Sequence, residues 1–321
     1  MANITRSLVL AAMVAATMLP SMPSAVAQSD NPLIRVGTGP NDPSLPLIYA
    51  DKSGLFKRAG LNVEVSRQAT TSTMAAGVIG GSLDIAQGSG LGAIQIIAKG
   101  VPLTLVGNLA LYNADKPDVG LLVLASSSIK TAQDLKGKTI AGVALQDLNS
   151  ISTVMWLEQR GVDTSTLQFV EIPASASLAA MEQNRIAATT VYEPFYSAFV
   201  ATGKVRVLGY PYEALSKHFA DSVIFAETKW ANEHRALIDR FLRALQEASA
   251  YVSSHEAESA PLMAQFAGLD PSTMPTMHHP ERSVAIAPSD IQPIIDAAVR
   301  SKLIPKTFAA ADIICTCALR R

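Results

Sequence analysis

Residues 83–99 read Leu-Asp-Ile-Ala-Gln-Gly-Ser-Gly-Leu-Gly-Ala-Ile-Gln-Ile-Ile-Ala-Lys, and this stretch decides the fold class. Residues 83–86 predict a short strand, the glycines at 88 and 90 predict a tight turn, and residues 93–99 predict a helix. On both sides of this unit the chain keeps alternating short β-rich runs with helical patterns. That alternation is typical of α/β proteins with largely parallel sheets, so the sequence predicts an α/β fold.

The first 27 residues have the features of a secretory signal peptide. Arg6 is the only charged residue there, and an apolar run follows it over residues 8–19. That run is well short of the ~20 apolar residues that a membrane-spanning helix needs. The Ala-Val-Ala triplet at 25–27 fits a cleavage site. We therefore expect cleavage of residues 1–27, a mature chain that begins near Gln28, and export to the periplasm.

Composition excludes some classes of function. The chain has 26 Lys and Arg against 27 Asp and Glu, with no basic stripe, which argues against a nucleic-acid partner. The only cysteines are Cys315 and Cys317, so the fold must rest on a hydrophobic core and not on a disulfide framework. A Cys-x-Cys pair could form a tight disulfide or contribute to a metal site, but we expect a frayed tail without a role.

The order of the predicted strands divides the chain into two lobes joined by two crossings, near residues 116–121 and 209–222. We expect lobe I to be discontinuous, formed by residues 28–116 and 222–321, and lobe II to comprise residues 117–221. The expected strands lie at 33–36, 61–65, 83–86, 103–106 and 223–226 in the first lobe and at 120–124, 169–172, 187–191 and 205–208 in the second.

Several segments in register resemble a known family. Residues 45–56, Leu-Pro-Leu-Ile-Tyr-Ala-Asp-Lys-Ser-Gly-Leu-Phe, followed by Gly-Leu-Asn-Val-Glu at 60–64, resemble the opening of the nitrate, sulfonate and taurine binding proteins of ABC importers, a class that includes relatives of the thiamine-pyrimidine proteins (NMT1/SsuA-like). The resemblance covers about residues 33–270 and continues through the segments 82–86, 134–140, 179–186 and 193–194. It implies a type II periplasmic-binding-protein fold, with two α/β lobes joined by a two-crossing hinge.

The resemblance also implies a role as the extracytoplasmic solute-binding component of an ABC importer, with a permease and its ATPase subunit as partners. We expect a monomer without enzymatic activity, cofactor or metal. Gly88-x-Gly90-x-x-Ala93 matches a dinucleotide-binding fingerprint, but Asn108 stands where that fingerprint needs an acid. A thiamine-pyrimidine synthase is a second enzyme alternative, and the predicted leader argues against it because such a synthase works inside cells.

Polar turns follow the predicted strands of both lobes. Ligands of open α/β sheets bind beyond the carboxyl ends of the strands, where helix starts offer free N–H groups. Each polar residue could instead serve as a plain helix cap. The candidate ligand-binding residues are Asn41, Asp42, Ser44, Thr71, Ser72, Gln87, Gly88, Ser89, Asp147, Asn149, Ser150, Tyr192 and Glu193.

The charge of the ligand stays open at this point. The turns contain Asp42, Asp147 and Glu193 and no Lys or Arg, which favours an amine or aminopyrimidine. The family resemblance favours a small organic anion of the sulfonate, nitrate or carboxylate type. We expect the anion, because acids at helix starts can point away from the cleft and cap the helices.

Overall fold

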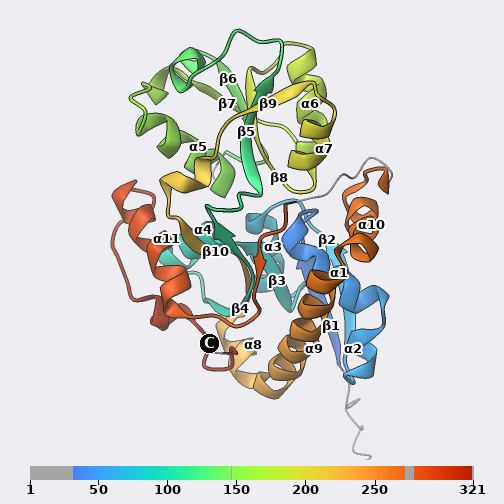
Figure 1. Ribbon diagram of the computed structural model, residues 1–321. Helices are drawn as coiled ribbons and strands as arrows, with labels where there is room; N and C mark the ends of the chain where they lie inside the picture. Colours follow the sequence, from blue (N-terminus) through green and yellow to red (C-terminus); the bar gives the residue numbers. More distant parts are fainter. Residues whose placement is uncertain (1–31, 146, 272–277, 320–321) are drawn as a thin grey trace, which may run out of the picture. The chain divides into compact units, whose positions relative to one another are not determined.

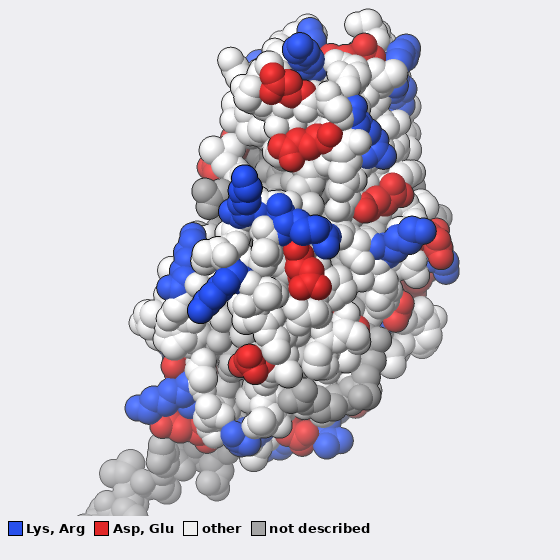
Figure 2. Space-filling model, turned by 90° about the vertical axis from the view of Figure 1, so that its left-hand side faces the viewer, with Lys and Arg blue, Asp and Glu red and all other residues white. Residues whose placement is uncertain are grey.

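The computed structural model describes residues 32–145, 147–271 and 278–319, which form two mixed α/β lobes (Figure 1). The predicted signal peptide lies outside the described residues. In the described part of the chain, no helix combines the length and apolar character needed to cross a membrane. On the face drawn in Figure 2, Lys and Arg are interspersed with Asp and Glu and form no continuous basic stripe.

The first sheet has the strand order β11-β4-β10-β3-β1-β2. β1, β2 and β3 run parallel, whereas β10 is antiparallel to both β3 and β4. The strands comprise β1 Leu33–Thr38, β2 Asn62–Arg67, β3 Ile85–Ser89, β4 Leu103–Asn113, β10 His218–Glu227 and β11 Glu281–Arg282.

Successive side chains of β10 point to opposite faces of this sheet and enter two separate cores. Val223 and Phe225 pack with helices α4 and α11, whereas Ile224 packs with α1, α2 and α9. The helices of this lobe are α1 Leu45–Lys52, α2 Leu55–Arg58, α3 Thr71–Ile79, α4 Gly90–Ala98, α8 Thr228–Glu233, α9 Arg235–Ser254, α10 Glu256–Ala267 and α11 Pro288–Arg300. In Figure 1, α9 lies beside α1 and α2, and α11 lies on the side of α4.

The second sheet has the order β7-β6-β8-β5-β9 and is mixed in the same way, because β5 is antiparallel to β8 and β9. Leu121 and Val123 face the core that contains α5, and Leu122 between them faces the core that contains α6 and α7. The elements are β5 Val119–Leu124, β6 Thr139–Gly142, α5 Leu148–Glu158, β7 Gln168–Glu171, α6 Ala174–Glu182, β8 Ala188–Tyr192, α7 Phe195–Ala201 and β9 Val205–Gly209.

The chain passes between the sheets twice. The first crossing joins β4 to β5, and the second joins β9 to β10 through the 3₁₀ helix η4, Pro211–Ala214. Both β4 and β10 are much longer than predicted, because each pairs with the other from the centre of the first sheet up to the crossing. The family fold and its two-crossing hinge are confirmed, whereas the limits of the lobes at residues 116/117 and 221/222 stay predictions.

The expected frayed tail is wrong for the residues up to 319. The 3₁₀ helix η6, Ala310–Ile313, leads to a bridge between Ile314 and Leu105 of β4, and Cys315 is buried. Cys315 and Cys317 form a disulfide. The tail is ordered because its apolar side chains, Ile313 and Ile314, complete the cores beside β4.

Candidate functional site

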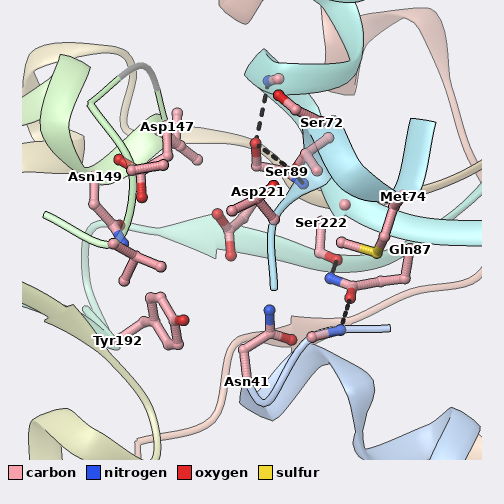
Figure 3. Close-up of a pocket in the computed structure, with 18 of the residues that line it drawn as sticks. Asn41, Ser72, Met74, Gln87, Ser89, Asp147, Asn149, Tyr192, Asp221 and Ser222 are labelled. Carbon is pink, nitrogen blue, oxygen red and sulfur yellow. Dashed lines mark hydrogen bonds between the residues drawn. The ribbon is translucent and has the colours of Figure 1, made fainter. Parts of the chain in front are cut away.

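A cavity of about 580 Å³ lies between the two sheets and receives side chains from both (Figure 3). Asn41, Gln87 and Ser222 reach it from the first sheet and its turns, whereas Asp147, Asn149 and Tyr192 reach it from the second. Its walls therefore consist mainly of the turns that follow the carboxyl ends of strands, the usual place for a ligand in an α/β protein.

Ten of the thirteen predicted residues line this cavity. The parallel strands of each sheet, β1–β3 and β6–β8, end toward the other lobe, which brings turns far apart in the sequence around one space. The ten are Asn41, Thr71, Ser72, Gln87, Gly88, Ser89, Asp147, Asn149, Tyr192 and Glu193. Their contact with a ligand stays a prediction.

Asp42 does not line the cavity, because it forms a buried ion pair instead. Its carboxylate lies 2.8 Å from Nη2 of Arg282 and 3.1 Å from Nδ1 of His279, and its side chain has no exposed surface. The partners come from the segment around β11, some 240 residues further along the chain. Arg282 therefore balances the charge of the predicted acid of the first turn. The ion pair lies behind the residues that line the cavity and stabilises their arrangement.

Ser44 and Ser150 also lie outside the lining. The Ser44 hydroxyl donates to the carbonyl oxygen of Gly39 at 2.6 Å, and the Ser150 hydroxyl donates to the carbonyl oxygen of Ala144 at 2.7 Å. Both hydroxyls hold the shape of a turn. Short polar side chains near helix starts commonly bond the local backbone in this way, but neither hydroxyl caps a helix: Ser44 makes no side-chain cap bond at the start of α1, and Asp147 is the N-cap of α5.

The wall from the first lobe is held rigid by side chains that bond each other. Gln87 accepts a hydrogen bond from the Gly39 N–H at 3.1 Å and donates one to the Ser222 hydroxyl at 2.6 Å. The Ser89 hydroxyl accepts from the Gly92 N–H at 3.1 Å and caps α4, and Thr71 Oγ1 accepts from the Ser89 N–H at 3.1 Å. Figure 3 draws the bonds of Gln87 and Ser89.

In the wall from the second lobe, polar side chains shape the start of α5. Asp147 is the N-cap and accepts from the Ser150 N–H at 2.8 Å, whereas Asn149 lies inside the first turn. Asn149 Oδ1 accepts from the Tyr212 hydroxyl at 2.8 Å, which ties α5 to the second crossing. Burial raises the pKa of Asp147 to about 6, although the bond from Ser150 opposes this shift.

Glu193 lines the cavity, but its carboxylate is occupied by protein donors. One oxygen accepts from the Ser197 N–H at 3.0 Å, and the other accepts from the Ser197 hydroxyl at 2.5 Å and from the His278 N–H at 3.1 Å. Burial raises the pKa of Glu193 to about 7, and these bonds oppose the shift. The side chain therefore caps α7 and fastens the segment around His278 to the second lobe.

Two acids at the crossings were missed. Asp118 of the first crossing and Asp221 of the second are buried and line the same cavity. Burial raises the pKa of both carboxyl groups, and the charge of Asp221 raises that of Asp118 further. Both positions fall inside the predicted crossings. An acidic residue within each crossing was the signal in the sequence, whereas all the candidate residues came from turns that follow strands.

Acids dominate the charge of the lining. Among the described lining residues the acids are Asp118, Asp147, Glu171, Glu193 and Asp221, and the only Lys or Arg is Lys99. Lys99 is exposed, so water screens its charge, whereas Asp118 and Asp221 are shielded from water. The cavity therefore favours groups that donate hydrogen bonds.

Comparisons with known proteins agree with this fold. The family model described as NMT1/THI5 like matches residues 41–259. A putative aliphatic sulfonates-binding protein of Escherichia coli (strain K12) is 27% identical over 235 residues, 70% of each chain. A synthase of 4-amino-5-hydroxymethyl-2-methylpyrimidine phosphate from Legionella pneumophila is 26% identical over 133 residues, which is 40% of this chain and 38% of the synthase.

Two solved structures show the same fold. The periplasmic aliphatic sulphonate binding protein SsuA from Escherichia coli aligns with a TM-score of 0.72 and 24% identity, over 88% of this chain and 97% of SsuA. The periplasmic nitrate-binding protein NrtA from Synechocystis PCC 6803 aligns with a TM-score of 0.73 and 15% identity, over 88% and 85%. The family model spans more than half of the chain, and the chain therefore belongs to the NMT1/THI5-like family.

Proposed function

We propose that this protein is the extracytoplasmic solute-binding component of an ABC importer and that it captures a small molecule between its two lobes. The observation that carries the proposal is the polar cavity of about 580 Å³, which both lobes line. Cavities of roughly 300–1,000 Å³ suit small organic ligands. A site shared by two lobes on a two-stranded crossing can close around its ligand by a hinge motion.

The relatives support this role. They are named as sulfonate-binding and nitrate-binding proteins, and the solved structures among them are described as periplasmic. We infer by analogy a periplasmic location, a cleaved signal peptide over residues 1–27, and a permease with its ATPase subunit as partners. The monomeric state and the absence of enzymatic activity belong to the same proposal.

The geometry favours a solute that carries an amine, an amidine or an aminopyrimidine group. The described lining holds five acids and one exposed Lys, and two of the acids are buried at the crossings. A ligand that donates hydrogen bonds can satisfy buried carboxyl groups, whereas a simple anion would meet repulsion there.

A small organic anion, which is the ligand expected from the sequence, is the second candidate. The relatives' names favour it, and so do the starts of α3 and α4, which border the cavity through Thr71, Ser72 and Ser89. N–H groups in the first turn of a helix lack partners within the helix, and the helix dipole attracts negative charge. The same cavity thus offers one anion-tolerant wall and one acidic wall.

Native mass spectrometry of protein prepared from the periplasm tests the proposal. We expect one small molecule to be retained under native conditions and released on denaturation, and its measured mass and charge state decide between the two ligand classes. Adding this solute to protein stripped by unfolding and refolding should lower the radius of gyration in solution scattering, because ligand binding selects the closed state. If no retained solute is found and the scattering profile stays the same with periplasmic extract, the proposal fails.

A further inference from the structure

Two buried carboxyl groups meet the cavity where the chain crosses between the sheets. Asp118 comes directly before β5, and its backbone oxygen accepts a hydrogen bond from the Glu193 N–H at 3.2 Å. Asp221 lies in β10, at an irregularity in its pairing with β4. The two residues are 3% and 9% exposed. Each acid thus sits on one of the two crossings, and both line the same cavity.

One oxygen atom of the Asp118 carboxyl group is left without a partner. Its Oδ1 atom is fully buried and has no hydrogen-bond partner among the described residues. A buried carboxyl oxygen in this state costs free energy unless a proton or a ligand donor satisfies it. Buried polar atoms in native proteins seldom lack a hydrogen-bond partner, and an exception needs an explanation such as a functional role. Since Asp118 lines the cavity, a bound solute can supply this donor.

The chemistry of the pair selects a positively charged group. Two carboxyl groups that share a buried site cannot both ionise easily, so such a pair retains a proton until a positive charge lies beside it. The charged and titratable groups that face the pair are Asp42, with Arg282 behind it, Glu193, Tyr112, and Tyr212, whose hydroxyl lies within hydrogen-bond reach of Asp221. In the described chain, no group of three or more His, Cys, Asp or Glu could hold a metal ion. An organic cation with several N–H donors fits better, because a planar fork of N–H groups matches carboxylates.

We infer that Asp118 and Asp221 form the subsite that binds a positively charged nitrogen group of the solute, an ammonium or amidinium. This inference rests on the proposed function and adds which side chains recognise the solute. The cation takes the place of the shared proton, which passes to the solvent on binding. Binding is therefore coupled to proton release, and affinity rises with pH over the range in which the pair loses its proton.

Benzamidinium and benzamide are matched probes for this subsite. They have nearly the same shape, but only benzamidinium is a cation, so the ratio of their affinities reports the subsite and cancels contacts with the rest of the cavity. Isothermal titration calorimetry should show wild-type protein binding benzamidinium at least about tenfold more tightly than benzamide, as a charge-assisted bond predicts. Titrations in buffers with different ionisation enthalpies should also show proton release with benzamidinium alone.

Asp118→Asn, Asp221→Asn and the double variant should each lose this preference and the proton release. Asp115→Asn is the matched control, because it removes an exposed acid from the same crossing and should leave both measurements unchanged. Circular dichroism checks that each variant is folded, and the two single variants test the pair independently if the double variant does not fold. Equal binding of the two probes, no binding of either at millimolar concentration, or a preference that survives in both single variants would overturn the inference. The proposed function would stand in those cases if a solute is retained and closes the protein.

Discussion

At the scale of single residues, the carboxyl groups of the cavity are of two kinds. Some accept hydrogen bonds from other parts of the protein, and others have an oxygen atom without a donor. Glu193 accepts hydrogen bonds from the N–H and hydroxyl of Ser197 and from the N–H of His278, whereas Asp118 Oδ1 has no partner among the described residues. A carboxylate with several donors stabilises the fold, whereas an unsatisfied carboxyl group has binding capacity left. The two kinds of acid therefore predict different mutant behaviour.

Glu193→Gln should lower the free energy of unfolding by about 1–3 kcal/mol, because the amide nitrogen cannot accept the bonds of Ser197 or His278. Urea denaturation measures this loss, and Ser197→Ala should reproduce part of it. We expect the affinity for the retained solute to change little at a temperature where the variant is fully folded. A tenfold loss of affinity with unchanged stability would instead place Glu193 in direct contact with the solute.

Asp221 should make stability depend on pH. Its pKa is raised by burial, so the folded state binds this proton more tightly than the unfolded state does. The resulting stabilisation is fully present below the unfolded pKa of about 4 and is lost as pH rises through the folded pKa. The melting temperature of solute-free protein should therefore fall between about pH 5 and about pH 8, and Asp221→Asn should flatten this fall. A steeper fall in the variant would contradict a raised pKa at this position.

At the scale of elements, the junction between β3 and α4 is packed too closely for a side chain. A Cβ atom at Gly88 would lie 2.7 Å from the Thr71 methyl carbon and 3.0 Å from Cε1 of Phe225. Gly88 therefore lets the first turn of α3 approach β3 and bring Thr71 and Ser72 to the cavity. The glycine of this turn has a packing role, whether or not it also contacts the solute.

Gly88→Ala should destabilise the protein by about 1–3 kcal/mol, as overpacking does in other cores, and should weaken binding by displacing α3. Adding Thr71→Ser should recover part of the stability, because it removes the methyl group that the new Cβ meets and keeps the hydroxyl that accepts from Ser89. Thermal unfolding of the two variants measures this coupling. The mechanism is wrong if the double variant is no more stable than Gly88→Ala alone.

At the scale of the whole described chain, one buried ion pair joins segments that are distant in the sequence. Arg282 reaches Asp42 beside the cavity from β11, and its side chain is 3% exposed. His278 and His279, four and three residues before Arg282, contact Glu193 and Asp42. The segment around β11 is thereby fastened both to the first turn of lobe I and to lobe II.

Arg282→Met should destabilise the protein by about 3–5 kcal/mol, because it leaves the Asp42 charge buried with only His279 beside it. The double variant Asp42→Asn/Arg282→Met should be clearly more stable than Arg282→Met, since no charge is then buried. Urea denaturation curves give both differences. If the single and double variants are equally unstable, the loss comes from the packing of Arg282 and not from the unpaired charge.

The alternation of strands and helices and the polar turns that surround the cavity can be predicted from the sequence, and the family resemblance adds the two-lobed fold. These features depend on local patterns: period-two and period-3.6 hydrophobicity, glycine turns and polar helix starts. Thr70 shows this well, because it caps α3 through a capping box with its near neighbour Thr73.

Contacts between distant segments determine which polar groups have hydrogen-bonding capacity left for a ligand. Asp42 and Ser150 have the same local pattern as Asn41 and Asn149, but one is neutralised by Arg282 from 240 residues away and the other bonds the Ala144 carbonyl. Asp118 and Asp221 lie about a hundred residues apart in the sequence, and neither belongs to the turns that were predicted to bind a ligand. They form one buried site because β4 and β10, which lead into and out of the crossings, pair with each other. Burial and long-range partners fix the charge of a carboxyl group, and neither can be read from its neighbours in the chain.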